Sequence, residues 1–148
     1  MSNISWMSDF FDVHGNQISK IFKAGGCREL WLQGQIFLYL EQEDLQTNAT
    51  KSKYDLYQEG VFACEVKVLG GNFQSKVMNS LRADFDKLTS KEIPEEKYVL
   101  LVLDKQEGTS TKLYRSLSTF SHKAGQKVLD KDLGAFSVTA WKVLQQIT

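Results

Sequence analysis

The chain has 148 residues, of which 42% are hydrophobic and 11% aromatic, and this is enough apolar material for the core of one domain. The composition excludes an intrinsically disordered chain and a miniature scaffold held together by disulfides. Eighteen basic residues balance eighteen acidic ones. A basic coat over the whole surface is therefore excluded, and any site for nucleic acid must be local.

Signals for secretion and for membrane insertion are not found in the sequence. No run approaches the roughly 18 apolar residues that a membrane-spanning helix needs. The first residues lack the charged and apolar regions of a signal peptide. We therefore expect a cytoplasmic protein without a membrane partner, in which Cys27 and Cys64 are free thiols.

We expect a single domain over residues 1–148, because no linker, repeat or low-complexity tract divides the chain. Its expected parts are an N-terminal helical arm, a core and a C-terminal extension, at residues 1–26, 27–103 and 104–148. The arm is expected to carry a short helix in its first twelve residues and a second helical turn over residues 16–23.

Residues 27–42 are apolar almost all round, a pattern that predicts a helix enclosed between other elements. Its polar residues are therefore of interest. Glu29 and Gln33 lie four positions apart and share one face of the helix. Each also has a plain interpretation: Glu29 is favoured in the first turn by the helix dipole, and Gln33 can be an ordinary polar residue.

Residues 53–57 and 61–69 predict a β-hairpin, because the three residues between them end in Gly60, as such loops often do. In this register Asp55 pairs with Ala63. The alternation along the second strand predicts an apolar face and a charged face. The apolar face carries Phe62, Cys64, Val66 and Val68, and the other carries Ala63, Glu65 and Lys67.

A helix is predicted from Gly70-Gly71 to about residue 88, with an apolar stripe at Phe73, Val77, Leu81, Phe85 and Leu88. We take Asp84 and Asp86 of this helix as solvated surface. Residues 98–103 predict a strand buried on both faces and parallel to the preceding one. A further helix is expected between residues 111 and 120, and a last strand at 136–143. The expected fold is α/β, with three layers and a mixed central sheet flanked by helices.

Three charged side chains gather on one face of the predicted hairpin: Asp55, Glu65 and Lys67. A loop of two or four residues would move Asp55 to the other face. Charges on a covered sheet face are costly unless they bind something. Two carboxylates suit Mg²⁺, and a nearby lysine can balance the charge on a phosphate. The chemistry that fits is phosphodiester hydrolysis, with Glu29 and Gln33 completing the site from one side.

The motif resembles that of the PD-(D/E)XK nuclease superfamily, which has the restriction-endonuclease-like fold: Asp55, nine intervening residues, then Glu65-Val66-Lys67. Residues 27–33 resemble the first core helix of that family, whose glutamate often joins the metal site. The likeness covers roughly residues 27–103, and Tyr54 stands where the family's named proline would be. It implies that Asp55 and Glu65 bind Mg²⁺ and that Lys67 assists the attacking water.

We therefore expect a Mg²⁺-dependent nuclease, with Mn²⁺ able to replace Mg²⁺ and DNA favoured over RNA, most simply a DNA endonuclease. One active site cuts one strand, so cleavage of both strands would need a homodimer. Six basic residues either line a phosphate-facing strip or are solvated surface: Lys105, Lys112, Arg115, Lys123, Lys127 and Lys131.

Two alternatives stay open. One is a catalytically inactive protein of the nuclease fold that binds nucleic acid or a protein partner, which the neutral net charge favours. The other is a small α/β interaction module in which the charges of Asp55, Glu65 and Lys67 are incidental.

Overall fold

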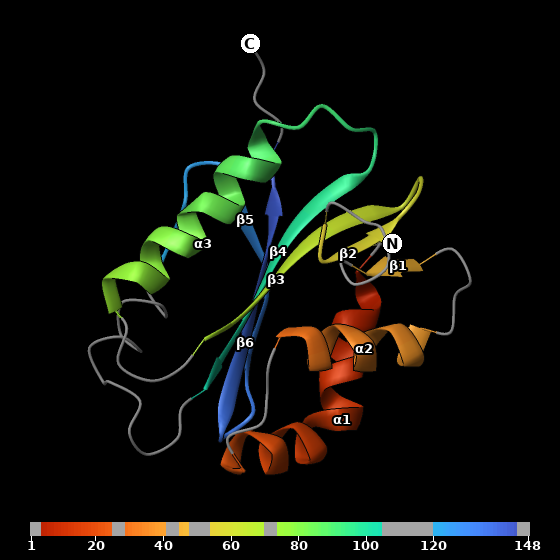
Figure 1. Cartoon of the computed structure of the whole chain (residues 1–148), viewed down its shortest axis with the longest axis vertical. Helices are drawn as coiled ribbons and strands as arrows, with labels where there is room; N and C mark the ends of the chain where they lie inside the picture. The colour runs from red at the N-terminus through yellow and green to blue at the C-terminus, as the bar shows by residue number, and fades with distance from the viewer. Residues whose placement is uncertain are drawn as a thin grey trace.

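The computed structural model describes residues 4–24, 29–40, 45–47, 54–69, 74–104 and 120–144, leaving out the side chains of 45–47, 69 and 74–78. In these residues six strands form one mixed sheet in the order β1-β2-β3-β4-β6-β5 (Figure 1). The strands are β1 (Leu45–Thr47), β2 (Leu56–Gln58), β3 (Phe62–Leu69), β4 (Glu96–Asp104), β5 (Gly125–Asp132) and β6 (Phe136–Val143). The helices are α1 (Ser5–Lys23), α2 (Glu29–Leu40) and α3 (Gln74–Thr89).

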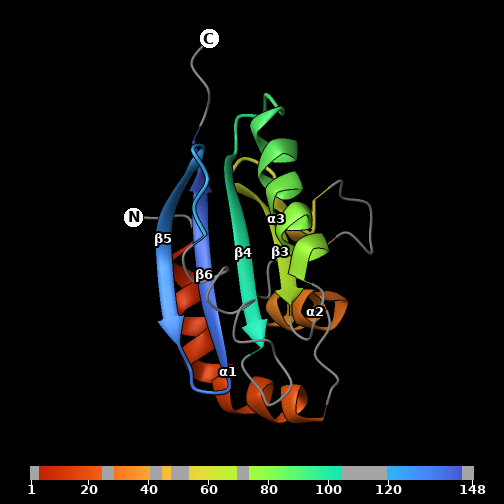
Figure 2. The same ribbon diagram turned by 90° about the vertical axis from the view of Figure 1, so that its left-hand side faces the viewer.

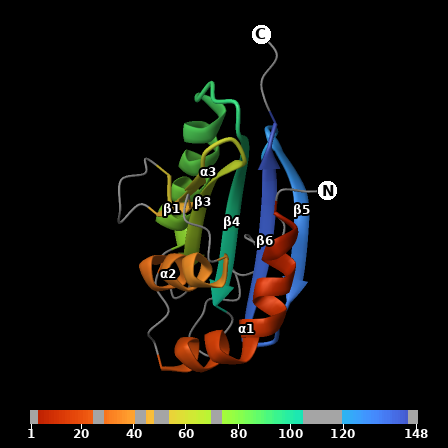
Figure 3. The same cartoon turned by 90° about the vertical axis from the view of Figure 1, so that its right-hand side faces the viewer.

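Helices cover both faces of the sheet. α3 lies against one face, and α1 and α2 lie against the other (Figures 2 and 3). Two hydrophobic cores result, because each face of the sheet must bury its own apolar side chains. The first core joins α1 and α2 to the sheet, and the second joins α3 to it. The expected α/β class, with helices on both sides of a mixed sheet, is confirmed.

Alternation along β3 divides its side chains between the two cores, as predicted. Phe62, Cys64 and Val66 are buried in the first core, and Ala63 is buried in the second. β4 contributes alternate residues to both cores and is buried along nearly its whole length, which is typical of a strand covered on both faces. β3 and β4 run parallel, and the helix between them is α3. This strand–helix–strand unit was predictable from periodicity alone.

α3 packs on the sheet through the apolar stripe that the sequence predicts. Leu81, Phe85 and Leu88 are fully buried in the second core. The ring of Phe85 stacks on His122 at a centroid distance of 4.8 Å and meets Trp141 edge-on at 5.6 Å. The other stripe positions, Phe73 and Val77, lie outside the described side chains. The buried stripe fixes which flank of α3 faces β3.

Both ends of the chain contribute to the fold, which corrects the expected arm and extension. α1 is one continuous helix rather than two short ones, because its apolar residues keep helical spacing from Met7 to Phe22 and are buried in the first core. β6 pairs with β4 and so lies inside the sheet. The last strand is confirmed at Phe136–Val143, whereas β5, a mostly exposed edge strand, was not expected.

The prediction that α2 is enclosed on all sides is wrong. Leu32 and Ile36 are fully buried against the sheet, but Leu30 and Leu38 are 64% and 62% exposed. A helix that covers one sheet face buries only the stripe that touches the sheet. The helix expected between residues 111 and 120 falls, except for Phe120, outside the described residues.

The hairpin register differs by two residues from the predicted one. Gln58 pairs with Phe62, and Tyr57 pairs with Ala63. The Val61 N–H donates to the Gln58 carbonyl at 3.0 Å, with Gly60 at a φ of 78°, so the turn closes one residue later than expected. A shift of two residues leaves every side chain on its predicted face.

Candidate active site

The carboxyl groups of Asp55 and Glu65 meet on the α3 side of the sheet. Asp55 directly precedes β2, and continuing the β2–β3 register places it level with Glu65. Glu65 is only 4% exposed, and its carboxyl group shares a hydrogen bond with that of Asp55. Two carboxyl groups can share a hydrogen bond only while one of them keeps its proton. The two predicted acids are thus brought together, and Asp55 lies opposite Glu65 rather than Ala63.

The pKa of Glu65 reflects this crowded position. Desolvation by burial is the largest cause of its shift, followed by the hydrogen bond with Asp55, and the pKa rises from 4.5 to about 8. An ion pair between Lys87 Nζ and Glu65 Oε1 acts in the opposite direction. The Glu65 carboxyl group therefore keeps its proton to a higher pH than an ordinary glutamate does.

Asp55 and a second acid, Glu29, bind backbone groups along one edge of β3. Val66 N–H donates to Asp55 Oδ2 at 2.7 Å, and Val68 N–H donates to Glu29 Oε1 at 3.3 Å. N–H groups two residues apart point to the same edge of a strand, and β2 pairs with β3 only as far as Cys64. The two carboxylates thus accept the hydrogen bonds that a neighbouring strand would otherwise accept. Without them each buried N–H would lack an acceptor, at a cost of about 1–3 kcal/mol.

Lys67 lies on the same face of β3 as Glu65, and α3 holds its ammonium group. Nζ donates to Ser80 Oγ at 2.7 Å and lies 3.3 Å from Asp84 Oδ2. The side chains of Lys67 and Asp84 are each only 16% exposed. That Asp84 oxygen makes no aligned hydrogen bond within the described residues, so its contact with Lys67 is an ion pair. The pKa of Asp84 is raised mainly by desolvation, which Lys67 opposes.

Glu29 is electrostatically part of the same group. Burial raises its pKa most strongly, the charge of Lys67 and the Val68 N–H lower it, and Asp55 and Asp84 raise it further. Its carboxylate contacts β3 in addition to standing in the favourable first turn of α2. Gln33, one turn further on, is 2% exposed, and its Oε1 has no hydrogen-bond partner within the described residues. The part that Gln33 plays in the site stays a prediction.

Three residues of α3 belong to the site although the sequence analysis did not select them: Ser80, Asp84 and Lys87. They lie at helical spacing on the flank next to the apolar stripe. The prediction that Asp84 is solvated surface is wrong, whereas Asp86 is indeed 75% exposed. Their spacing was visible in the sequence. The sequence pattern of α3 did not show that the flank with Ser80, Asp84 and Lys87 packs against the charged face of β3.

The donor set suits a hard divalent cation. Mg²⁺ usually binds through one or two carboxylates and completes its octahedron with waters and phosphate oxygens, and Asp55 and Glu65 offer such a pair. Within the described ranges, no group of three or more His, Cys, Asp or Glu side chains is placed to hold a metal ion. A site closed entirely by the protein, as structural zinc needs, does not fit the described residues.

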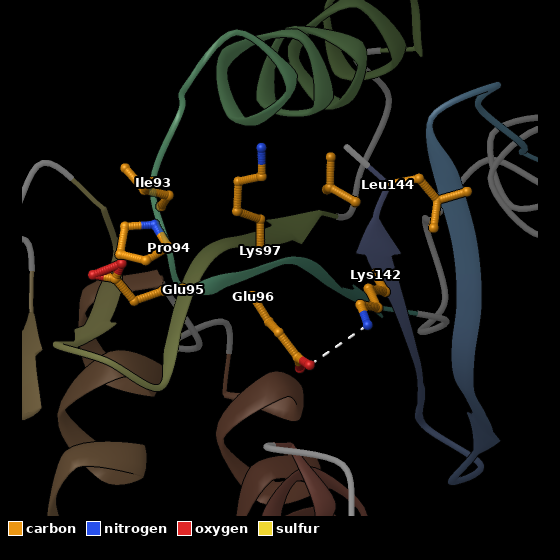
Figure 4. Close-up of a pocket in the computed structure, with 8 residues that line it drawn as sticks. Ile93, Pro94, Glu95, Glu96, Lys97, Lys142 and Leu144 are labelled. Carbon is orange, nitrogen blue, oxygen red and sulfur yellow. Dashed lines mark ion pairs between the residues drawn. The ribbon is translucent and has the colours of Figure 1, made fainter. Parts of the chain in front are cut away.

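A separate pocket of about 330 Å³ lies where β4 begins and β6 ends (Figure 4). Lys97 points from it toward α3 and donates to the carbonyls of Leu88 and Lys91 at 2.8 and 3.0 Å. Glu96 points to the opposite side, toward Lys142, and pairs with it at 3.5 Å. These charges are held in contacts within the fold, and the pocket is lined by neither acid of the Asp55–Glu65 pair.

The described lysines of the expected basic strip are Lys123, Lys127 and Lys131, and Lys123 is exposed. Whether these lysines face phosphate stays a prediction. Lys127 pairs with Asp130 on the same edge strand. Lys131 instead reaches α1, where it binds Asp12 and Ser8. The remaining positions Lys105, Lys112 and Arg115 lie outside the described residues.

Comparison of the chain with protein-family models, with curated proteins and with solved structures finds no match. No helix in the described part of the chain is both long enough and apolar enough to span a membrane.

Proposed function

We propose that this protein is a Mg²⁺-dependent nuclease of the restriction-endonuclease-like fold, a member of the PD-(D/E)XK superfamily that cleaves DNA rather than RNA. Asp55 and Glu65 would hold Mg²⁺, or Mn²⁺ in its place, and Lys67 would assist the attack of water. The observation that carries the proposal is the contact of half-buried Asp55 with buried Glu65. The experiment that tests it is cleavage of plasmid DNA by the wild type and by a Lys67 variant.

Of the three acids Glu29, Asp55 and Glu65, Glu65 is the one whose presence the fold itself explains least. Asp55 and Glu29 each bind a backbone N–H of β3, which accounts for a carboxylate at both positions. The Glu65 carboxyl group is instead buried between another acid and a lysine. A buried ionisable group of this kind is a cost to the fold, and clusters of groups with shifted pKa values concentrate at functional sites.

The fold adds support. The order of α2, hairpin, α3 and parallel β4 matches the core that the motif implies. β3 carries the acid and the lysine two residues apart, so both lie on the face that α3 covers. Asp55 joins them from the position directly before the neighbouring strand, β2.

Each residue of the site would have its own role in hydrolysis. A divalent ion between Asp55 and Glu65 would supply a water of lowered pKa and a positive charge for the phosphate oxygens. The Val66 N–H holds Asp55 in alignment. The ammonium of Lys67, held by α3, can stabilise the negative charge that develops on the phosphate. Glu29 borders the same site, and its raised pKa suits a group that exchanges protons with water.

Nicking of supercoiled plasmid in Mg²⁺ or Mn²⁺ tests the proposal directly. We expect cleavage by the wild type, none in EDTA, and a loss of about 10²-fold or more in rate for Lys67→Ala. Lys142→Ala serves as the matched control, because Lys142 pairs with Glu96 on the face of the sheet opposite α3. Circular dichroism checks that each variant is folded.

Calorimetry separates binding of the metal from cleavage. The wild type should bind Mn²⁺, and Asp55→Asn and Glu65→Gln should each lose most of that binding. A folded wild type that neither binds a divalent ion nor cleaves plasmid in its presence would overturn the proposal.

A second candidate is a protein of the same fold that binds nucleic acid or a protein partner without cleaving it. Two observations favour it. No third acidic ligand stands with Asp55 and Glu65 within the described residues, and Glu65 already has a cationic partner in Lys87. Retention of DNA in a gel-shift assay without cleavage in either Mg²⁺ or Mn²⁺ would favour this candidate.

A further inference from the structure

The cation that contacts Glu65 comes from α3 and is less buried than its partner. Lys87 Nζ forms an ion pair with Glu65 Oε1. The Glu65 side chain is 5% exposed, whereas that of Lys87 is 38% exposed. Nζ also lies 5.4 Å from the centre of the Tyr54 ring, next to Asp55 in the chain. The lysine therefore reaches the acid pair from the surface, over an aromatic ring.

The other nearby lysine is held differently. Lys67 has Ser80 and Asp84 as partners, and both belong to α3. Among the described residues, Lys87 is thus the cation whose contact with Glu65 is at an oxygen that a metal ion would need. An ammonium group and a divalent ion cannot both occupy that oxygen, because each requires the same lone pairs and each repels the other.

We propose that Lys87 is a further residue of the active site, which occupies Glu65 in the metal-free protein and sets the affinity for the divalent ion by competing with it. This inference rests on the proposed metal site. Lys87 would leave Glu65 when an ion is held there, and its side chain, which is 38% exposed, can turn toward solvent.

Replacement of Lys87 by an uncharged residue of similar length tests the competition. Lys87→Met removes the ammonium and keeps most of the stem that covers Tyr54. Lys142→Met is the matched control, because Lys142 is 39% exposed and pairs with an exposed glutamate, Glu96, on the other face of the sheet. Lys87→Arg keeps the charge and should restore the competition.

The measurement is calorimetric titration of MnCl₂ into each metal-free protein at about pH 8.5, where protons compete least for the acids. We expect Lys87→Met to bind Mn²⁺ about tenfold more tightly than the wild type, which corresponds to about 1.4 kcal/mol. Lys142→Met and Lys87→Arg should stay within about twofold of the wild type. If Lys87→Met does not fold, Lys87→Gln replaces it, since an amide can still donate to Glu65 without a charge.

The outcomes distinguish this inference from the proposed function. Equal or weaker Mn²⁺ binding by a folded Lys87→Met, with binding intact in the wild type, would show that the Lys87–Glu65 contact is only structural and would overturn the inference alone. Failure of both the wild type and Lys87→Met to bind Mn²⁺ would overturn the metal site and the inference with it.

Discussion

Replacement of Glu65 by glutamine should stabilise the metal-free protein at neutral pH. Glutamine has nearly the same shape, its N–H can donate to Asp55, and its carbonyl oxygen can accept from Lys87. It therefore keeps both contacts of the protonated carboxyl group. It lacks only the charge that burial makes costly.

The magnitude follows from the pKa of Glu65. Because the pKa is raised from 4.5 to about 8 in the folded protein, the folded state binds the proton more tightly than the unfolded chain does. The stability that this proton contributes is complete below pH 4.5 and is lost as the pH rises toward 8. By about pH 7 the loss amounts to about 3 kcal/mol, at about 1.4 kcal/mol per pH unit.

Urea unfolding followed by tryptophan fluorescence measures the effect in the presence of EDTA. Glu65→Gln and the wild type should have similar free energies of unfolding near pH 4.5, and the variant should be about 3 kcal/mol more stable near pH 7. Glu59→Gln, in the exposed hairpin turn, is the control and should differ little from the wild type at either pH. A Glu65→Gln variant that is equally destabilised at both pH values would refute the reasoning, because Glu65 would then act as an ordinary ion-pair partner of Lys87.

Two further predictions concern the core. Gly125→Ala should lower the free energy of unfolding by about 1–3 kcal/mol, because a Cβ there would lie 2.8 Å from Cε1 of Phe85, whose ring packs on His122 and Trp141. In the same urea assay the control is Gly15→Ala, at a position in α1 with open space around it. This variant should raise the free energy of unfolding by about 0.5–1 kcal/mol. Cys64 is fully buried and burial raises the pKa of its thiol, so in a Cys27→Ser background it should react with a thiol reagent only as fast as the protein unfolds. Rapid labelling under native conditions, or a Gly125→Ala variant as stable as the wild type, would show that this packing is looser than described.

Side-chain periodicity made much of the site predictable. The side chains of a strand alternate with a period of two, so Glu65 and Lys67 had to share a face whatever the register. Asp55 was expected opposite Ala63 and lies opposite Glu65 instead, yet its face was predicted correctly, because the register differs by an even number of residues. The buried strand β4 and the stripe of α3 were predictable for the same reason.

Other elements could not be read from local patterns. β5 is polar along most of its length because it is an edge strand with one exposed face, so no apolar run marked it. Leu30 and Leu38 of α2 are apolar but exposed, and composition alone predicted them to be enclosed. In the sequence Asp84 is indistinguishable from a solvated acid of a surface helix. Only the packing of α3 on the sheet shows its contact with Lys67.

The sequence by itself determined the α/β class, the two faces of β3 and the set of charged residues that share one of them, since these follow from periodicities within single segments. Only the tertiary structure decided that Glu65 loses its solvent and gains Lys87 as a partner. Those two residues are 22 positions apart, and their contact depends on how α3 docks on the sheet. Burial and charge pairing depend on the packing of the elements against one another, and so does the raised pKa of Glu65 in this candidate site.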